Sequence, residues 1–383
     1  MIRNVFLKNL LTSTVFETLS LLNKTIKKND NIILLYSDLG FRDNIKYLYD
    51  HLIRNKFNDK YKIVCAVKNY ESFKQNAPKN VVFTSPIKGI ATYVTCKHVF
   101  YCFGKLPIVP TNKQKVIQMW HGTSFKGFSE NMKKTAKTSD FYTYVYASSE
   151  YFKPIVMKKF NCNENKVVIC GHPRTDIMYK KNVVPKMMVN KKNIIWMPTF
   201  RSSKLLGQQD TKQENVLPIL NNDQFIELDN FLQQNNVNLI VKLHPMQDTS
   251  EIDLKKFINL KLLTNAEFEK QNLDLYEMLS QTDGLITDYS SVFYDYLLLN
   301  KPIGFTEDDV LEYKKNRGFA VDPDKFRPGQ KIRTINDLKK FIENVSRNND
   351  EFVDERREIN NLSNYYKDGK NCVRTLQLSN IFI

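Results

Sequence analysis

The chain has 383 residues, with 57 Lys plus Arg against 41 Asp plus Glu, so its formal net charge is +16. Hydrophobic residues make up 42% and aromatic residues 12%, which excludes an intrinsically disordered protein. No apolar run reaches the roughly 18–20 residues that span a bilayer, and the length predicts two domains of roughly 150 residues each. The six cysteines form no C-x-x-C pair, so we expect neither a zinc site nor a disulfide framework, but a reducing cytosolic compartment.

Residues 1–28 predict a basic amphipathic helix. Its apolar side chains share one broad face at helical spacing: Leu7, Leu10, Leu11, Val15, Leu21 and Leu22. Polar residues interrupt that face too often for a secretory signal. Such a helix can lie in a membrane interface or dock on the first domain, and both interpretations stay open.

Beyond this helix, short β-branched runs alternate with helical stretches. We expect strands over 32–36, 62–67, 81–84, 98–103, 116–120, 141–147 and 167–170, with helices over 43–55 and 149–160. The charged, proline-containing segment 180–192 is typical of a linker. Strands then follow over 194–198, 238–243, 260–263, 284–287 and 302–305, with helices over 223–234, 275–281 and 290–299 and a charged helical tail from residue 335.

This alternation predicts an α/β protein with parallel sheets covered by helices. We expect domains over 29–185 and 186–345, and a tail over 346–383 that packs on them. The expected architecture is two Rossmann-like, doubly wound domains facing each other across a cleft. Ligands of such sheets bind at the carboxyl ends of the strands, so we look for chemistry at the strand-to-helix junctions.

The positive charge could serve nucleic acid, an anionic membrane surface or a phosphorylated substrate. The sequence contains no nucleic-acid-binding signature, so we expect no nucleic-acid partner. It also lacks a P-loop, a G-x-G-x-x-G after the first strand, a G-x-S-x-G elbow and a D-x-D pair at the end of a strand. We therefore expect a transferase without metal or cofactor, in which basic side chains and helix dipoles balance the charge of a diphosphate.

The first junction with such chemistry is QMWHGTSFKGF. His121 follows the strand over 116–120, and Gly122 allows a sharp turn close to a ligand. Thr123 and Ser124 supply hydroxyls or a helix cap. His121 is well placed as a general base, and a histidine that merely caps the strand is the alternative of equal weight.

Three further junctions carry basic side chains. In VKLHP, His244 and Lys242 can hold phosphate oxygens, although an ordinary strand-end histidine is the more frequent case. In CGHPRTD, we expect Arg174 to bind phosphate bidentately and His172 to be structural.

The junction WMPTFRSS places a hydroxyl and a guanidinium at the mouth of a strand. Thr199 and Arg201 there suit a nucleotide or phosphate. For this run taken alone, a loop with a solvated arginine is a better explanation than a nucleotide or phosphate site.

The sharpest local pattern is LITDYSSVFYDY, in which a short strand meets an apolar helix. The hydroxyls of Ser290 and Ser291 and the free amides of the helix N-terminus predict a phosphate site. Plain capping would explain one of the serines. Asp295 cannot attract phosphate, so we expect it to bind a hydroxyl of ribose or glycerol.

Together, WHGT, G-x-P-R-x-D, PTFR, KLHP and TDYSS-x-x-(Y/F)-D resemble the CDP-glycerol glycerophosphotransferases of teichoic acid and capsule synthesis. The resemblance covers about residues 120–329 and includes RGF at 317–319. It implies a GT-B-like fold, peripheral attachment to the cytoplasmic face of the cell membrane, and a lipid-linked or polymeric glycan as acceptor. The implied reaction transfers glycerol phosphate from CDP-glycerol to an acceptor hydroxyl and releases CMP.

The resemblance also implies roles for individual residues. His121 would be the catalytic base, and His244 would stabilise the diphosphate. The donor would be bound by Gly122, Thr123, Ser124, Phe125, Arg174, Thr199, Phe200, Arg201, Lys242, Leu243, Ser290, Ser291 and Asp295. Ser124 and Phe125 stand where the family usually has Pro-Leu, which leaves the polyol and the acceptor open. The alternative is a related GT-B transferase that uses CDP-ribitol or a nucleotide sugar.

Overall fold

The computed structural model describes residues 5–103, 106–127, 139–181, 183–199, 202–203, 208–209, 217–243 and 256–383. The chain forms two compact units. The first comprises Met1–His121, Thr135–Asp176 and Asp368–Ile383, and the second comprises Gly122–Lys134 and Ile177–Lys367.

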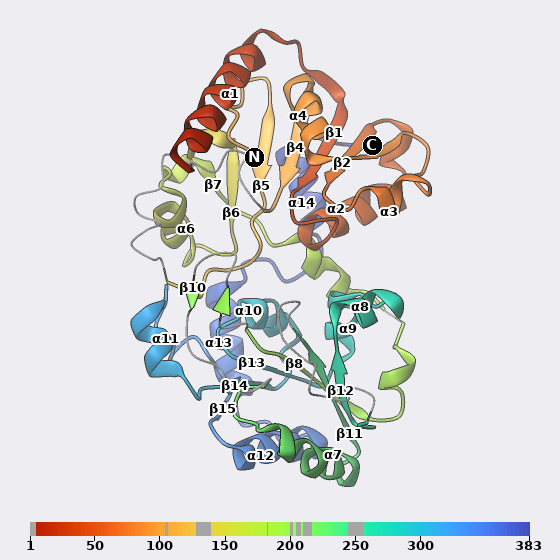
Figure 1. Ribbon diagram of the computed structural model, residues 1–383, viewed down its shortest axis with the longest axis vertical. Coiled ribbons are helices and arrows are strands. Elements are labelled where there is room, and N and C mark those ends of the chain that lie inside the picture. Colours follow the sequence, from red (N-terminus) through yellow and green to blue (C-terminus); the bar gives the residue numbers. More distant parts are fainter. Residues whose placement is uncertain are drawn as a thin grey trace. The chain divides into compact units, whose positions relative to one another are not determined.

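The first unit is built on a seven-stranded parallel sheet with the strand order β3-β2-β1-β4-β5-β6-β7 (Figure 1). Its strands are β1 Asn29–Ser37, β2 Lys62–Val67, β3 Val81–Thr84, β4 Cys96–Tyr101, β5 Lys115–Gln118, β6 Tyr144–Ala147 and β7 Val167–Ile169. In β1, Leu34 pairs with Val64 of β2 and Val99 of β4. The order reverses between β1 and β4, which is where doubly wound sheets bind ligands.

Helices cover both faces of this sheet, because successive strand side chains point to opposite sides. Ile33 and Leu35 pack in a core that includes residues of α2 (Asp43–Arg54) and α14 (Asn371–Leu378). Leu34 and Tyr36 pack in a second core under α1 (Val5–Thr25), α4 (Pro86–Thr95) and α6 (Lys153–Phe160). Both faces are therefore buried, which explains the nearly continuous hydrophobic runs of the strands.

The carboxyl-terminal half of α1 docks on the first unit through polar contacts. The Asn23 amide donates to the Val109 carbonyl at 2.9 Å and to Gln114 at 2.7 Å. The buried Lys28 ammonium donates to the Asn23 and Val94 carbonyls, both at 2.6 Å. The other side of this half exposes Val15, Leu21 and Leu22. Within the described residues, no helix has both the length and the apolar character needed to cross a membrane.

The second unit contains a six-stranded parallel sheet with the order β12-β11-β8-β13-β14-β15 (Figure 1). Its strands are β8 Lys192–Met197, β11 Val237–Lys242, β12 Leu260–Leu263, β13 Gly284–Thr287, β14 Ile303–Thr306 and β15 Gln330–Ile332. Its helices are α7 Phe225–Gln234, α8 Asn265–Lys270, α9 Leu275–Gln281, α10 Val292–Tyr296, α11 Val310–Asn316, α12 Ile335–Ser346 and α13 Val353–Ser363. The strand order corresponds to 3-2-1-4-5-6, with the reversal between β8 and β13.

The predicted fold class, α/β with two doubly wound parallel sheets, is confirmed. The strands β2, β3, β12 and β13 and the helix α9 have the predicted bounds. The predicted helix over 290–299 is α10 followed by a 3₁₀ turn at Leu297–Leu299. The tail over 346–383 is divided between the two units, because α13 belongs to the second unit and α14 to the first.

Candidate active site

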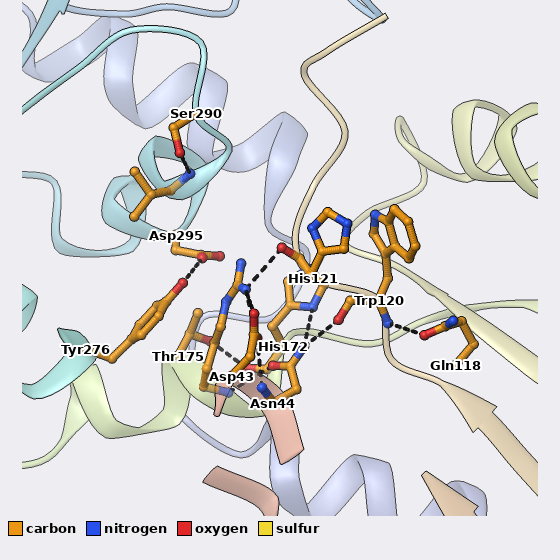
Figure 2. Close-up of polar contacts among 12 residues, drawn as sticks. Asp43, Asn44, Gln118, Trp120, His121, His172, Thr175, Tyr276, Ser290 and Asp295 are labelled. Carbon is orange, nitrogen blue, oxygen red and sulfur yellow. Dashed lines mark hydrogen bonds and ion pairs between the residues drawn. The ribbon is translucent and has the colours of Figure 1, made fainter. Parts of the chain in front are cut away.

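Three loops meet at the carboxyl end of the first sheet, and Asn44 joins them (Figure 2). Asn44 is fully buried at the start of α2. Its Nδ2 donates to the carbonyl of Trp120, after β5, at 2.8 Å and lies 3.4 Å from Nδ1 of His172, after β7. Its Oδ1 accepts the amide of Arg174 at 3.2 Å. One side chain thus sets the relative positions of these loops.

The neighbouring Asp43 binds the Arg174 side chain. Arg174 Nη1 donates to the two carboxylate oxygens of Asp43 at 2.8 and 2.9 Å, and to the carbonyl of His121 at 3.1 Å. The Arg174 side chain is only 5% exposed. The sequence predicts that this guanidinium binds phosphate; in the structure its Nη1 contacts Asp43 and the turn that carries His121.

The backbone around His121 is strained. Trp120 has φ 57° and Gly122 has φ 128°. Asp43, which faces the same turn, also has φ 57°. Left-handed conformations cost non-glycine residues roughly 1–3 kcal/mol and occur where surrounding contacts enforce them, often at functional sites. Here the Asn44 bond to the Trp120 carbonyl and a 3.0 Å bond from the Trp120 amide to Gln118 hold the turn.

His121 itself is half-buried between aromatic neighbours. Its ring stacks on Phe103, with centroids 5.4 Å apart and planes 11° apart, and lies 4.0 Å from the ring of Trp120. Burial lowers the pKa of His121 to about 4, and the positive charge of Lys159 acts in the same direction. The imidazole is therefore neutral near pH 7 and can accept a proton.

His172 and Asp176 make structural contacts, as the sequence suggested for His172. His172 is 4% exposed, and burial lowers its pKa to about 3, with Arg174 as the second cause. The Asp176 carboxylate accepts the amides of Asn371 at 2.8 Å and Cys372 at 2.7 Å. Asp176 thus satisfies free amides at the start of α14.

The segment after His121 belongs to the second unit. There the Gly127 amide donates to the Gly318 carbonyl at 2.8 Å, and the Ala320 amide donates to the Phe125 carbonyl at 2.9 Å. The segment 125–127, which follows the WHGT run, is therefore paired with residues 318–320.

The side chains of this segment are largely covered. Phe125 is 1% exposed and packs edge-on against Phe293, with ring centroids 5.2 Å apart. Thr123 and Ser124 are 5% and 6% exposed. Gly122 is also buried. Phe125 is thus a core residue in this structure.

Asp288 connects the two loops at the strand-order reversal of the second sheet. It is fully buried directly after β13, and Thr199 follows β8. Its Oδ2 accepts the Thr199 amide at 2.8 Å, and its Oδ1 accepts the Thr199 hydroxyl and the Tyr289 amide, each at 2.5 Å. The hydroxyl that the sequence offered to a donor is therefore engaged with Asp288.

Ser290 and Ser291 are half-buried before the short helix α10. Ser290 Oγ accepts the Val292 amide only at 3.5 Å, and Ser291 makes no side-chain cap bond within the described residues. Plain capping thus explains neither serine well. Asp295, 1% exposed, accepts the Tyr276 hydroxyl at 2.6 Å (Figure 2).

The end of β11 supplies one accessible cation. Lys242 Nζ donates to Asn265 at 2.8 Å and lies 5.4 Å from the ring centroid of Phe268. The next residue, Leu243, is 1% exposed and packs in the core. His244, Phe200 and Arg201 lie outside the described residues.

Sequence reasoning missed Asp43, Asn44, Phe103 and Lys159. A signal existed for the first two, because they open the helix after β1, beside the reversal in strand order. Phe103 and Lys159 carry no local pattern, and only the fold brings them to the Trp120–His121 turn.

Comparison with known proteins gives a consistent result. The family profile described as CDP-Glycerol:Poly(glycerophosphate) glycerophosphotransferase matches residues 18–379. The chain is 28% identical to the teichoic acid ribitol-phosphate polymerase TarK of Staphylococcus aureus, over 83% of this chain and 63% of that protein. It is 26% identical to a teichoic acid poly(glycerol phosphate) polymerase of Bacillus spizizenii, over 92% of this chain and 90% of the relative.

Among solved structures, the chain is similar to the wall teichoic acid polymerase TagF. The TM-score is 0.75 at 20% identity, over 98% of this chain and 95% of the compared chain. At 20% identity, this similarity is evidence for the fold alone.

Proposed function

Because the chain belongs to the CDP-glycerol:poly(glycerophosphate) glycerophosphotransferase family, we propose that it transfers glycerol phosphate from CDP-glycerol to an acceptor hydroxyl in teichoic acid or capsular polymer synthesis. The profile match over residues 18–379 carries this proposal. In the reaction, the acceptor oxygen bonds to the phosphorus that bears glycerol. The bond from that phosphorus to the bridging oxygen breaks, CMP leaves with the electron pair, and the hydroxyl proton passes to a base.

His121 is the proposed base. Its neutral imidazole at the end of β5 supports this role, because a general base must be unprotonated at the working pH. The strained turn held by Asn44 and Arg174 supports it further, since it fixes the residue that approaches the substrate. Arg174 then acts as a positioning residue.

The donor is proposed to bind at the carboxyl end of the second sheet. The hydroxyls of Ser290 and Ser291 and the Lys242 ammonium are the described groups suited to the diphosphate, with His244 and Arg201 added from the sequence. Charge neutralisation and positioning make up most of phosphoryl-transfer catalysis, which fits these groups.

For the other residues that were predicted to contact the donor, the proposed role depends on whether the protein covers their side chains. Four of these residues support the donor site from below, because other parts of the protein bury them or accept or donate their hydrogen bonds. They are Thr199, Leu243, Phe125 and Asp295. Gly122, Thr123 and Ser124 are buried and are retained as residues that can contact the donor through the backbone, and Phe200 is retained from the sequence alone.

CMP release tests the activity directly. We would supply CDP-glycerol, CDP-ribitol or a nucleotide sugar with a membrane extract as acceptor. Release from CDP-glycerol supports the proposal, and His121→Ala and His244→Ala should each abolish it while circular dichroism stays unchanged. Release from the nucleotide sugar alone would overturn the proposal.

A ribitol donor is the second candidate. The chain is as similar to a ribitol-phosphate polymerase, at 28% identity, as to a glycerol-phosphate polymerase, at 26%. In the same assay, release from CDP-ribitol without release from CDP-glycerol would select it.

The proposed location is the cytoplasmic face of the membrane, with a lipid-linked or polymeric glycan as acceptor. The net charge of +16 supports attraction to anionic lipid, and the outer side of α1 offers Val15, Leu21, Leu22 and Lys24. Flotation with anionic and neutral liposomes tests this. The double variant Leu21→Ser/Leu22→Ser should float less with anionic vesicles, and unchanged flotation would remove α1 from the membrane contact.

A further inference from the structure

The His121 ring lies in an aromatic environment that carries two cations. It contacts the rings of Phe103 and Trp120, from the end of β4 and the end of β5. The Arg42 guanidinium lies 5.5 Å from the Phe103 ring centroid, and the Lys159 ammonium lies 4.5 Å from the Trp120 ring centroid. Each of the two aromatic rings beside the imidazole thus has a cationic group over it.

A histidine base is commonly oriented by a carboxylate hydrogen-bonded to its second nitrogen. In the part of the chain that the structure describes, no such bond reaches His121. Asp43 is the carboxylate that influences it, and both Asp43 oxygens bind Arg174. The charged groups facing the ring are therefore Lys159 from α6, Arg42 and Asp43 at the start of α2, and Arg174 after β7.

We propose that Phe103 and Lys159 tune His121: the Phe103 ring sets the plane of the imidazole, and Lys159, which lies over the neighbouring Trp120 ring, keeps a positive charge close to it. The inference rests on the proposed function only in taking His121 as the base. Stacked rings with planes 11° apart restrict rotation about the side chain. A cation close to an imidazole raises the free energy of the imidazolium.

This arrangement has a chemical consequence. Stacking holds the plane of the ring without using either nitrogen. Within the described residues no carboxylate bonds to the ring, so the protein does not select one tautomer through a carboxylate.

Nuclear magnetic resonance of the full chain with labelled histidine tests the proposal without any substrate. The chain has five histidines, so the His121 signals can be assigned by comparison with His121→Gln. In Phe103→Leu, loss of the ring current should move the His121 ring protons downfield, whereas Phe103→Tyr should retain their positions. Unchanged shifts in Phe103→Leu would overturn the positioning role of Phe103.

Lys159→Met should raise the pKa of His121 measured by this titration, by roughly half a pH unit or more. The matched control is Lys158→Met, because Lys158 is the exposed neighbour on the same helix. An unchanged titration in Lys159→Met, or an equal shift in both variants, would overturn the role of Lys159.

CMP release separates this inference from the proposed function. If the function holds, Phe103→Leu should lower kcat at least tenfold with little change in the KM for CDP-glycerol, and Lys159→Met should move the acid limb of the pH profile upward. If the wild-type chain releases no CMP while the resonance shifts follow the expectation, the positioning stands and the function fails. If CMP release is intact and the shifts do not change, the positioning fails alone.

Discussion

Arg174 donates from one nitrogen to both carboxylate oxygens of Asp43, although 131 residues separate the two in the chain. Replacing Asp43 by Asn should leave a buried guanidinium without its counter-charge. We expect the free energy of unfolding to fall by roughly 3 kcal/mol. Urea denaturation measures this.

Asp50→Asn is the control for that experiment, because Asp50 lies on the same helix and pairs with Lys46 at the surface, with side-chain exposures of 32% and 34%. Its loss should stay below about 1 kcal/mol. Equal losses in the two variants would contradict a structural role for the Asp43–Arg174 pair.

The second prediction concerns the bond between Thr199 and Asp288. Thr199→Val keeps the shape of the side chain but removes the hydroxyl that donates to Asp288 at 2.5 Å. A fully buried carboxylate then loses a donor, so we expect a loss of roughly 1–3 kcal/mol in stability and a fall in CMP release. Thr199→Ser retains the hydroxyl and should behave like the wild type. If Val and Ser variants are indistinguishable, the hydroxyl does not support the site.

The third prediction concerns the pairing of the segment 125–127 with residues 318–320. A Cβ on Gly127 would lie 2.8 Å from the Arg317 carbonyl oxygen and 2.8 Å from the Gly318 carbonyl carbon. Backbone atoms cannot move aside as a flexible side chain can, so Gly127→Ala should cost roughly 1–3 kcal/mol. Lys126→Ala preserves the backbone pairing with Phe319 and serves as the control. A Gly127→Ala variant with wild-type Tm would show that the close approach is not maintained in solution.

The fourth prediction is that the protein loses stability in mild acid. Burial lowers the pKa of His98 to about 4 and that of His172 to about 3, against 6.5 for the free side chain. Below pH 6.5 the unfolded chain therefore binds protons that the folded chain does not. The free energy of unfolding should fall as the pH drops from about 6.5 to 4, on the order of 2–3 kcal/mol for each histidine.

Urea denaturation at pH 7, 5.5 and 4.5 tests the acid effect. In His98→Asn, the slope of stability against pH should be smaller than in the wild type. His98 accounts for part of the slope because it is buried between Ser379 and the Asp30 carbonyl, at 2.9 and 3.1 Å. The same slope in this variant would exclude a contribution from His98.

Much of the fold was predictable because the apolar patterns of strands and helices, and the turns that bound them, are local. The strand at Val81–Thr84 and the helix at Leu275–Gln281 match their predicted bounds for this reason. The strand β15 was missed because Gln330–Ile332 contains one apolar residue and no alternation to detect. The helix α4 was also missed, although Ser85 and Pro86 form an N-terminal signal that the structure uses.

The site was only partly predictable. The position of His121 after a buried strand follows from local sequence, and the structure places it there. The partner of Arg174 could not be inferred, because a carboxylate and a phosphate satisfy a guanidinium equally well and the sequence does not show which lies within reach. Asp288 adjoins the predicted serines, but its bond to Thr199 depends on the pairing of β8 with β13.

The first unit contains residues from both ends of the described chain, and this affects how the unit folds during synthesis on the ribosome. Asn371 and Cys372 of α14 bind Asp176, and Tyr146 donates to Thr375 at 2.9 Å. The nascent first sheet must therefore wait, with the face that α14 covers still open, until residues 371–378 have been translated. Folding of this unit cannot finish before that of its neighbour begins, and a chaperone has its longest opportunity to bind at the bare surface of β6 and β7.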